Sequence, residues 1–288
     1  MDRRGFLTGT AGLLLAGCTP REHRISVGTK NFTEQLVLGE LLAQVLEGRT
    51  HAPVERRFYL AGSYICHQSI LAGRIDTYVE YTGTALAAIL KLPVRTDSTA
   101  VFETVRSEYL RRINLVVLPS LGFNNTFALS MRGDDARAKG IAKLSDLAAS
   151  APQMRLGVGY EFLERADGFP GLSKTYGLQF AAPPTVMDLG LLYRALEARQ
   201  VDIIAGSNTD GLIAALGLVV LEDDRHYFPP YDAVTIVRPE ALQQFTGMQA
   251  ALESLSGRIT TEAMRRMNYA VDGEKRDAAD VVRQFLGH

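Results

Sequence analysis

The sequence Arg74-Ile75-Asp76-Thr77-Tyr78-Val79-Glu80-Tyr81-Thr82-Gly83-Thr84 contains the unit around which the chain is organised. Residues 75–81 alternate as a β-strand does, which predicts two faces: Ile75, Thr77, Val79 and Tyr81 on one, and Asp76, Tyr78 and Glu80 on the other. Residues 63–72 have the pattern of a short helix closed by Gly73, and residues 82–84 break the strand and start another helix. In α/β proteins, ligands bind at the carboxyl ends of strands. We therefore expect Tyr81 and Thr84 beside a ligand.

A second copy of this unit lies further along the chain. Residues 192–199 predict a helix, residues 201–205 a strand, and Ser207-Asn208-Thr209-Asp210-Gly211 the turn into a further helix. Asp202 precedes Ser207 by the spacing that separates Asp76 from Tyr81. Two related strand ends that face a ligand predict two lobes with a binding cleft between them.

Length and composition predict sizeable cores and about two domains. With 288 residues and 47% hydrophobic residues, the chain can bury sizeable cores in about two domains. The net charge is −1 and the pI about 6.5. Because phosphate binding needs clustered Lys and Arg, this balance argues against nucleic acid as a partner.

The N-terminus predicts export. Residues 1–17 have the order of a secretory signal, with charged, apolar and then small residues, and the apolar run is too short to remain as a spanning helix. Leu15-Ala16-Gly17-Cys18 resembles a bacterial lipobox, in which Cys18 is acylated and becomes the first mature residue. We therefore expect an exported lipoprotein anchored in the membrane, with residues 18–24 as a tether. Arg3-Arg4-Gly5-Phe6-Leu7 fits either a twin-arginine signal or an ordinary secretory one.

The remaining pattern predicts an α/β architecture with two crossings. Lobe 1 is expected over residues 25–123 and 229–288, with lobe 2 over residues 124–228. The crossings, near residues 122–125 and 228–232, would serve as the hinge. Asn31 followed by Glu34 predicts the start of a helix directly after a strand over residues 25–28. Lys30 lies between the two, and by spacing alone it would be a solvated surface charge.

No pattern supports an enzyme. The chain contains no G-x-S-x-G elbow, P-loop or dinucleotide fingerprint, and its histidines lack metal-ligand spacing, so we expect neither a cofactor nor a metal. After lipidation of Cys18, Cys66 is the single unmodified cysteine, which excludes an intramolecular disulfide. Its apolar helical surroundings predict buried packing.

Several segments resemble the extracytoplasmic substrate-binding protein of osmoprotectant ABC transporters, whose ligands are quaternary amines such as glycine betaine, choline and carnitine. In chain order they are Val27-Gly28-Thr29-Lys30-Asn31-Phe32-Thr33-Glu34-Gln35, Tyr78-Val79-Glu80-Tyr81-Thr82-Gly83-Thr84, Asn124-Asn125-Thr126-Phe127-Ala128-Leu129, Thr209-Asp210-Gly211 and Pro229-Pro230-Tyr231. The resemblance implies a two-lobed periplasmic-binding-protein fold of type II. It also implies permease and ATPase subunits as partners, and we expect a monomer.

The resemblance also implies a binding site. Quaternary ammonium groups cannot donate hydrogen bonds, so aromatic faces surround them. By position, this cage would use Tyr81, Phe127, Ser207 and Tyr231, and the carboxylate grip Lys30, Thr84 and Arg165, with Asn125 beside them. The family usually has Tyr at the positions of Phe127 and Ser207, so an aromatic wall is missing here.

The missing wall leaves the ligand open. Tyr64 or Tyr160 could replace it, whereas Tyr78 and Tyr193 fit core or lobe-surface positions, and Asp76 and Asp202 fit turn caps. Alternatively, the gap admits a bulkier betaine, including an imidazole-bearing one of the ergothioneine kind. An amino acid or a non-methylated amine as ligand, and a sensor domain without a transport role, are the other interpretations.

Overall fold

The computed structural model describes residues 24–287. The predicted signal segment, Cys18 and nearly all of the tether lie outside these residues. Within them, no helix combines the length and apolar character needed to cross a membrane.

The first sheet is mixed, and its central strand is the predicted one. Its order is β2 (Val54–Arg57), β1 (Ile25–Gly28), β3 (Thr77–Tyr81), β10 (Asp232–Val237) and β4 (Val116–Asn124). β1 runs parallel to β2 and β3, whereas β10 is antiparallel to both β3 and β4. All of β3 is buried, so both faces of this strand pack against protein. A charged residue in it, Glu80, therefore needs a partner inside the fold.

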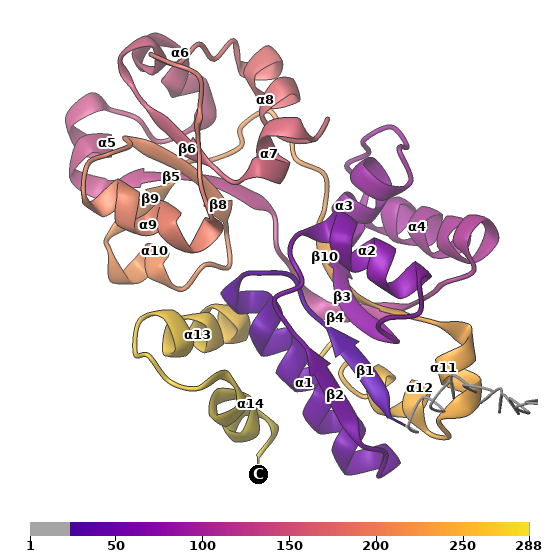
Figure 1. The fold of residues 1–288 in the computed structure, drawn as a ribbon. Helices are drawn as coiled ribbons and strands as arrows, with labels where there is room; N and C mark the ends of the chain where they lie inside the picture. Colours follow the sequence, from indigo (N-terminus) through magenta and orange to yellow (C-terminus); the bar gives the residue numbers. More distant parts are fainter. Residues whose placement is uncertain (1–23, 288) are drawn as a thin grey trace, which may run out of the picture.

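Helices cover both faces of this sheet (Figure 1). On one side α1 (Thr33–Thr50) packs against α12 (Met248–Glu253), α13 (Thr261–Asp272) and α14 (Ala278–Leu286). The other side carries α2 (Ser63–Leu71), the short α3 (Thr82–Thr84) with the π-helix Ala85–Ile89, and α4 (Ser98–Ile113). α11 (Pro239–Gln244) follows β10. We call this sheet and its helices lobe 1.

The second sheet has the order β7 (Thr185–Val186), β6 (Leu156–Val158), β8 (Ile203–Ser207), β5 (Phe127–Arg132) and β9 (Leu218–Val220). Its helices are α5 (Gly133–Lys139), α6 (Leu147–Ser150), α7 (Tyr160–Glu164), α8 (Phe169–Tyr176), α9 (Leu189–Glu197) and α10 (Leu212–Ala215), with 3-10 turns at Leu144–Asp146 and Ala151–Gln153. We call this part lobe 2.

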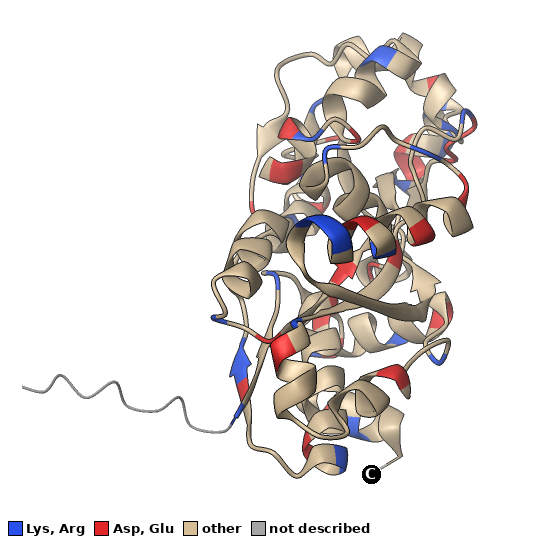
Figure 2. Cartoon of the chain, turned by 90° about the vertical axis from the view of Figure 1, so that its right-hand side faces the viewer, with Lys and Arg blue, Asp and Glu red and all other residues tan. Residues whose placement is uncertain are grey.

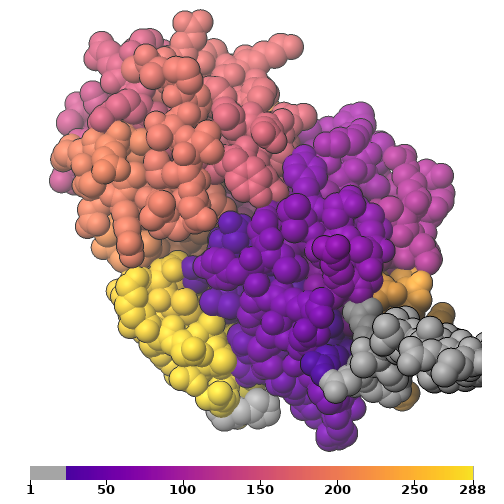
Figure 3. Space-filling view, in the orientation of Figure 1, coloured from indigo at the N-terminus to yellow at the C-terminus, as the bar shows by residue number. Residues whose placement is uncertain are grey.

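Two crossings join the lobes side by side. The chain leaves lobe 1 through β4 into β5 and returns into β10, and the backbone N–H of Asn125 donates to the carbonyl of Tyr231 at 2.9 Å between them. Gly122 in the first crossing has φ +113°, and a Cβ there would lie 2.9 Å from the backbone of Gly257 and Ile259. Only glycine fits this place. Figure 3 shows the lobes in contact along the drawn face, with the yellow C-terminal helices against lobe 1.

The predicted two-lobed α/β fold is confirmed, and both repeated units form. Tyr81 ends β3 and Ser207 ends β8. The predicted lobe boundaries stay a prediction. After β10, α11 and α12 are separate helices, and Gly247 between them takes a left-handed conformation with φ +83°.

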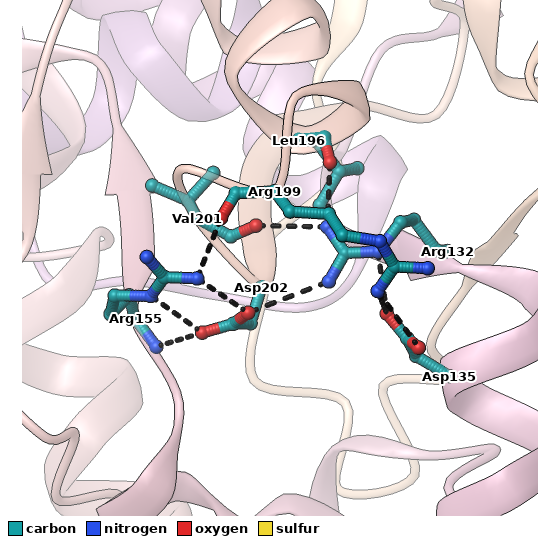
Figure 4. A network of polar contacts seen from close by, with 7 residues as sticks. All are labelled: Arg132, Asp135, Arg155, Leu196, Arg199, Val201 and Asp202. Atoms are coloured by element: carbon teal, nitrogen blue, oxygen red, sulfur yellow. Dashed lines mark hydrogen bonds and ion pairs between the residues drawn. The ribbon is translucent and has the colours of Figure 1, made fainter.

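Asp202, directly before β8, lies in a network of polar contacts within lobe 2 (Figure 4). Its carboxylate accepts hydrogen bonds from Arg155 at 2.8–3.0 Å and from Arg132 at 3.4 Å. In lobe 1, Asp76 accepts from the backbone of Ser26 at 2.8 Å and pairs with Arg238 at 3.1 Å. Both aspartates therefore tie strands together rather than simply capping turns. In the view of Figure 2, basic and acidic residues are interspersed along the chain.

Candidate functional site

A cavity of about 350 Å³ lies between the lobes. Its walls come from the loop after β1, the end of β3, the first crossing, α7, the end of β8 and the second crossing. The structure brings all the predicted site residues to this one cavity: Lys30, Tyr81, Thr84, Asn125, Phe127, Arg165, Ser207 and Tyr231. Sections of chain that are far apart in sequence thus meet at one cavity, and the carboxyl ends of β3 and β8 are among them.

Lys30 is buried, with 2% of its surface exposed, and not the solvated charge that spacing alone indicates. Its Nζ forms an ion pair with Glu80, the carboxylate in the middle of β3. The same Nζ lies 4.6 Å from the centroid of the Tyr81 ring. An ammonium has three donors, so a pairing with one carboxylate leaves capacity for a ligand.

Arg165 is the second buried cation. Nε and Nη2 hold the carboxylate of Asp167 at 2.9 and 2.5 Å, and the Tyr231 hydroxyl donates to the same carboxylate at 2.7 Å. Burial by itself lowers the pKa of Arg165, but the hydrogen bonds and charge of Asp167 outweigh it, so the pKa is raised. The guanidinium lies over the ring of Phe127 at 5.2 Å.

The aromatic residues predicted as a cage form part of a larger cluster. Phe127 meets Phe162 and Tyr231 edge-to-face, with centroids 4.8 and 5.4 Å apart. Arg165 also lies 5.9 Å from the Tyr231 ring. The ring faces of Tyr81, Phe127 and Tyr231 therefore already stabilise positive charge, because each lies beside a cationic side chain of the protein.

Glu34 holds two of the cavity-lining residues in place, although the sequence predicted it only as part of a helix start. The predicted helix start at Asn31 is wrong, because α1 begins at Thr33 with Phe32 as its N-cap. Glu34 instead turns inward and is 1% exposed. It accepts hydrogen bonds from the Tyr81 hydroxyl at 2.6 Å, Asn125 Nδ2 at 2.5 Å and Asn268 Nδ2 at 3.1 Å.

The Glu34 cluster joins the lobes. Asn125 also donates to the Thr209 hydroxyl at 2.9 Å, and its Oδ1 accepts from Ser207 at 2.7 Å. Burial raises the pKa of Glu34, although the hydrogen bonds from Thr209, Tyr81 and Asn125 oppose this. The signal in the sequence that could have indicated this buried carboxylate is a glutamate in the first turn of an otherwise largely apolar helix.

Beyond Ser207 the cavity continues to an acidic end. Asp210 accepts hydrogen bonds from the Tyr193 hydroxyl at 2.5 Å and from the backbone of Ser207 at 2.8 Å. Burial raises the pKa of Asp210 to about 7. Tyr193, expected at a core or surface position, also lines the cavity, and so do Asp188 and Asp272.

Of the two tyrosines suggested as replacement walls, Tyr160 lines the cavity. Tyr64 instead packs under Lys91, whose Nζ lies 5.2 Å from its ring centroid. Cys66 is buried, as predicted, and burial raises its pKa to about 12. Across residues 24–287, no group of three or more His, Cys, Asp or Glu side chains is arranged to hold a metal ion.

Comparisons with known proteins show which transport proteins the chain is similar to. The chain is 35% identical over 266 residues to the ergothioneine transport permease/ergothioneine binding protein of Helicobacter pylori (strain G27), covering 92% of this chain and 47% of that one, so it spans about half the length of this relative. It is 30% identical to the carnitine transport binding protein of Listeria monocytogenes serotype 1/2a (strain 10403S), covering 96% of this chain and 92% of that one.

A solved structure of a glycine betaine/carnitine/choline ABC transporter matches with a TM-score of 0.74 and 31% identity, covering 91% of this chain and 97% of that chain. Residues 23–288 match the family described as the substrate binding domain of the ABC-type glycine betaine transport system. The chain therefore belongs to this family of transport substrate-binding proteins.

Proposed function

We propose that this protein is the extracytoplasmic solute-binding lipoprotein of an ABC importer, and that it binds a quaternary ammonium compound between its lobes. The observation that carries the proposal is the inter-lobe cavity, where aromatic rings and two buried cations converge. A betaine has a methylated cation at one end and a carboxylate at the other, so it needs both kinds of group in one site.

The cationic end of the ligand would meet aromatic faces and acidic side chains. Tyr81, Phe127 and Tyr231 already lie beside cationic side chains, which supports their affinity for positive charge. A desolvated cation–π contact contributes about 2 kcal/mol. Asp188 and Asp272 line the same cavity and add negative potential.

The carboxylate end would be held by Lys30, Arg165 and the hydroxyl of Thr84. Lys30 uses one donor on Glu80, and Arg165 uses one edge of its guanidinium on Asp167. The remaining N–H groups can each take a carboxylate oxygen. The buried partners also fix both side chains before the ligand arrives, which lowers the entropy cost of binding.

Delivery requires the lobes to open and close. Lys30, Tyr81 and Thr84 belong to lobe 1, Phe127 and Arg165 to lobe 2, and Tyr231 to the second crossing. A ligand that contacts both lobes stabilises the closed form only through those simultaneous contacts. A lipid at Cys18 would keep the protein beside its permease and ATPase.

A second candidate is a larger betaine that bears a ring of the imidazole kind. Ser207 supports it, because a serine leaves the cavity open toward Tyr193 and Asp210, where N–H groups of a ring would find acceptors. The 35% identity to a relative named as an ergothioneine binding protein supports the same ligand.

Titration calorimetry with glycine betaine, carnitine, choline and ergothioneine tests the proposal. Tyr81→Ala should abolish binding of every ligand that the parent binds. Tyr64→Ala is the matched control, because Tyr64 is a tyrosine of lobe 1 outside the cavity lining. Undiminished affinity in Tyr81→Ala would contradict the proposed site.

A further inference from the structure

We propose that Glu161 is a closure latch: a positioning residue of lobe 2 whose carboxylate caps the start of α2 in lobe 1 when the cleft is shut. The backbone N–H of Ser63 donates to Glu161 Oε1 at 2.6 Å. Ser63 begins α2 in lobe 1, whereas Glu161 lies in α7 of lobe 2. This contact joins the two lobes directly, and both residues line the cavity.

Helix α2 needs such a partner. Its first N–H groups have no acceptors inside the helix, and its N-terminus carries a partial positive charge. The N-cap residue is Gly62, which has no side chain with which to cap. A carboxylate is the group that best satisfies both the free N–H groups and the charge. Here that carboxylate comes from the opposite lobe.

Glycine is needed at position 62 because a side chain would collide with lobe 2, and not because the backbone conformation requires it. Its φ of −79° and ψ of −170° are open to any residue. However, a Cβ at Gly62 would lie 2.2 Å from Glu161 Oε1 and 2.1 Å from the Tyr160 hydroxyl. A methyl group there would displace the carboxylate in the closed form, whereas the open form would accept it.

The latch is also connected to the ligand cavity. The other oxygen of Glu161, Oε2, lies 4.0 Å from Nη1 of Arg165, and both residues line the cavity. The N–H of Arg165 donates to the carbonyl of Glu161 at 3.0 Å, so one helical turn holds both side chains. This link to the ligand rests on the proposed function; the latch between the lobes does not.

Distances between two spin labels measure the latch directly. Labels at Ser107→Cys on α4 and Lys174→Cys on α8 report on the separation of the lobes, and both positions are exposed. Cys66 is buried, so the label spares it, and Cys18 is replaced by serine. The test variants are Glu161→Gln and Gly62→Ala. The control is Glu164→Gln, which makes the same change at an exposed position of the same helix.

Without ligand, Glu161→Gln and Gly62→Ala should each lower the ratio of short to long distances by about tenfold. Glu161→Gln removes the charge that strengthens the hydrogen bond from Ser63, and Gly62→Ala displaces the carboxylate. Glu164→Gln should keep the parent ratio. A residue that only contacts ligand would leave this ratio unchanged. With glycine betaine or ergothioneine added, the concentration needed for half closure should rise about tenfold in the two test variants.

Unchanged ratios and unchanged half-closure concentrations in Glu161→Gln, or equal effects in Glu164→Gln, would overturn the latch. A parent protein that shows only the long distance, with and without every ligand, would overturn it too, because the contact would then not form. If the parent closes without ligand but responds to no quaternary amine, the proposed function fails. The ratio of short to long distances in the variants, measured without ligand, still shows whether Glu161 holds the lobes together.

Discussion

Arg165→Met tests the buried ion pair that supports the binding site. Asp167 is fully buried, and Arg165 supplies both of its charged hydrogen bonds. Methionine keeps apolar packing against the Phe127 ring. Of the three side-chain hydrogen bonds to Asp167 described above, the one from the Tyr231 hydroxyl would remain. Stranding one charge of a buried pair costs about 3–5 kcal/mol, so the free energy of unfolding should fall by that amount.

Urea denaturation of the ligand-free protein measures this loss. The double variant Arg165→Met with Asp167→Asn should be more stable than Arg165→Met alone, because it removes the stranded charge. Arg155→Met is the control: its partner Asp202 accepts a similar set of hydrogen bonds, but the Arg155 side chain is 48% exposed, so its loss should cost less than about 1 kcal/mol. Equal costs in Arg165→Met and Arg155→Met would refute the reasoning. Calorimetry should also show that Arg165→Met weakens betaine binding more than choline binding, because choline has no carboxylate.

Three further predictions concern the polar cluster and the open wall. Tyr81→Phe removes the hydroxyl that donates to Glu34 at 2.6 Å, and urea denaturation should show a loss of about 1.5–3 kcal/mol; no loss would mean that this hydrogen bond does not stabilise the fold. Ser207→Tyr should exclude ergothioneine from the cavity while glycine betaine still binds, and competition calorimetry measures both affinities. Retained ergothioneine binding would contradict the proposal that Ser207 leaves room for a ring beside Tyr193 and Asp210. Asp210 has a pKa of about 7 when folded against an ordinary value of 3.8, so the folded protein binds this proton more tightly than the unfolded chain. The stabilisation that protonated Asp210 gives the fold is therefore complete below about pH 4 and is lost as pH rises to about 7. Asp210→Asn should make the unfolding free energy depend less on pH across that range. An unchanged slope of unfolding free energy against pH would contradict the assignment.

The sequence predicts much of the fold because its periodicity is local. The strand over residues 25–28 and the two repeated units form at or near the predicted positions, and Tyr81 and Ser207 end their strands as expected. These features follow from alternation, glycine breaks and short turns, which neighbouring residues determine.

The partners of the site residues could not be predicted in this way. Glu34 has the spacing of a helix start, yet its carboxylate reaches Asn125 and Asn268, which come from other parts of the chain. The pairings of Lys30 with Glu80 and of Glu161 with Ser63 likewise join segments that only the folded chain brings together. A buried charge in an apolar strand indicates that a partner exists, but spacing does not name it.

Thermal unfolding of the protein without residues 1–17 and with Cys18→Ser, against a panel of solutes, tests the central claim most directly. The panel would contain glycine betaine, choline, carnitine, ergothioneine and several plain amino acids. A ligand at a hundred times its dissociation constant adds about 2.7 kcal/mol to the unfolding free energy, which raises the midpoint visibly. The account predicts such a rise with at least one quaternary amine and none with the amino acids. A rise with amino acids alone would contradict it.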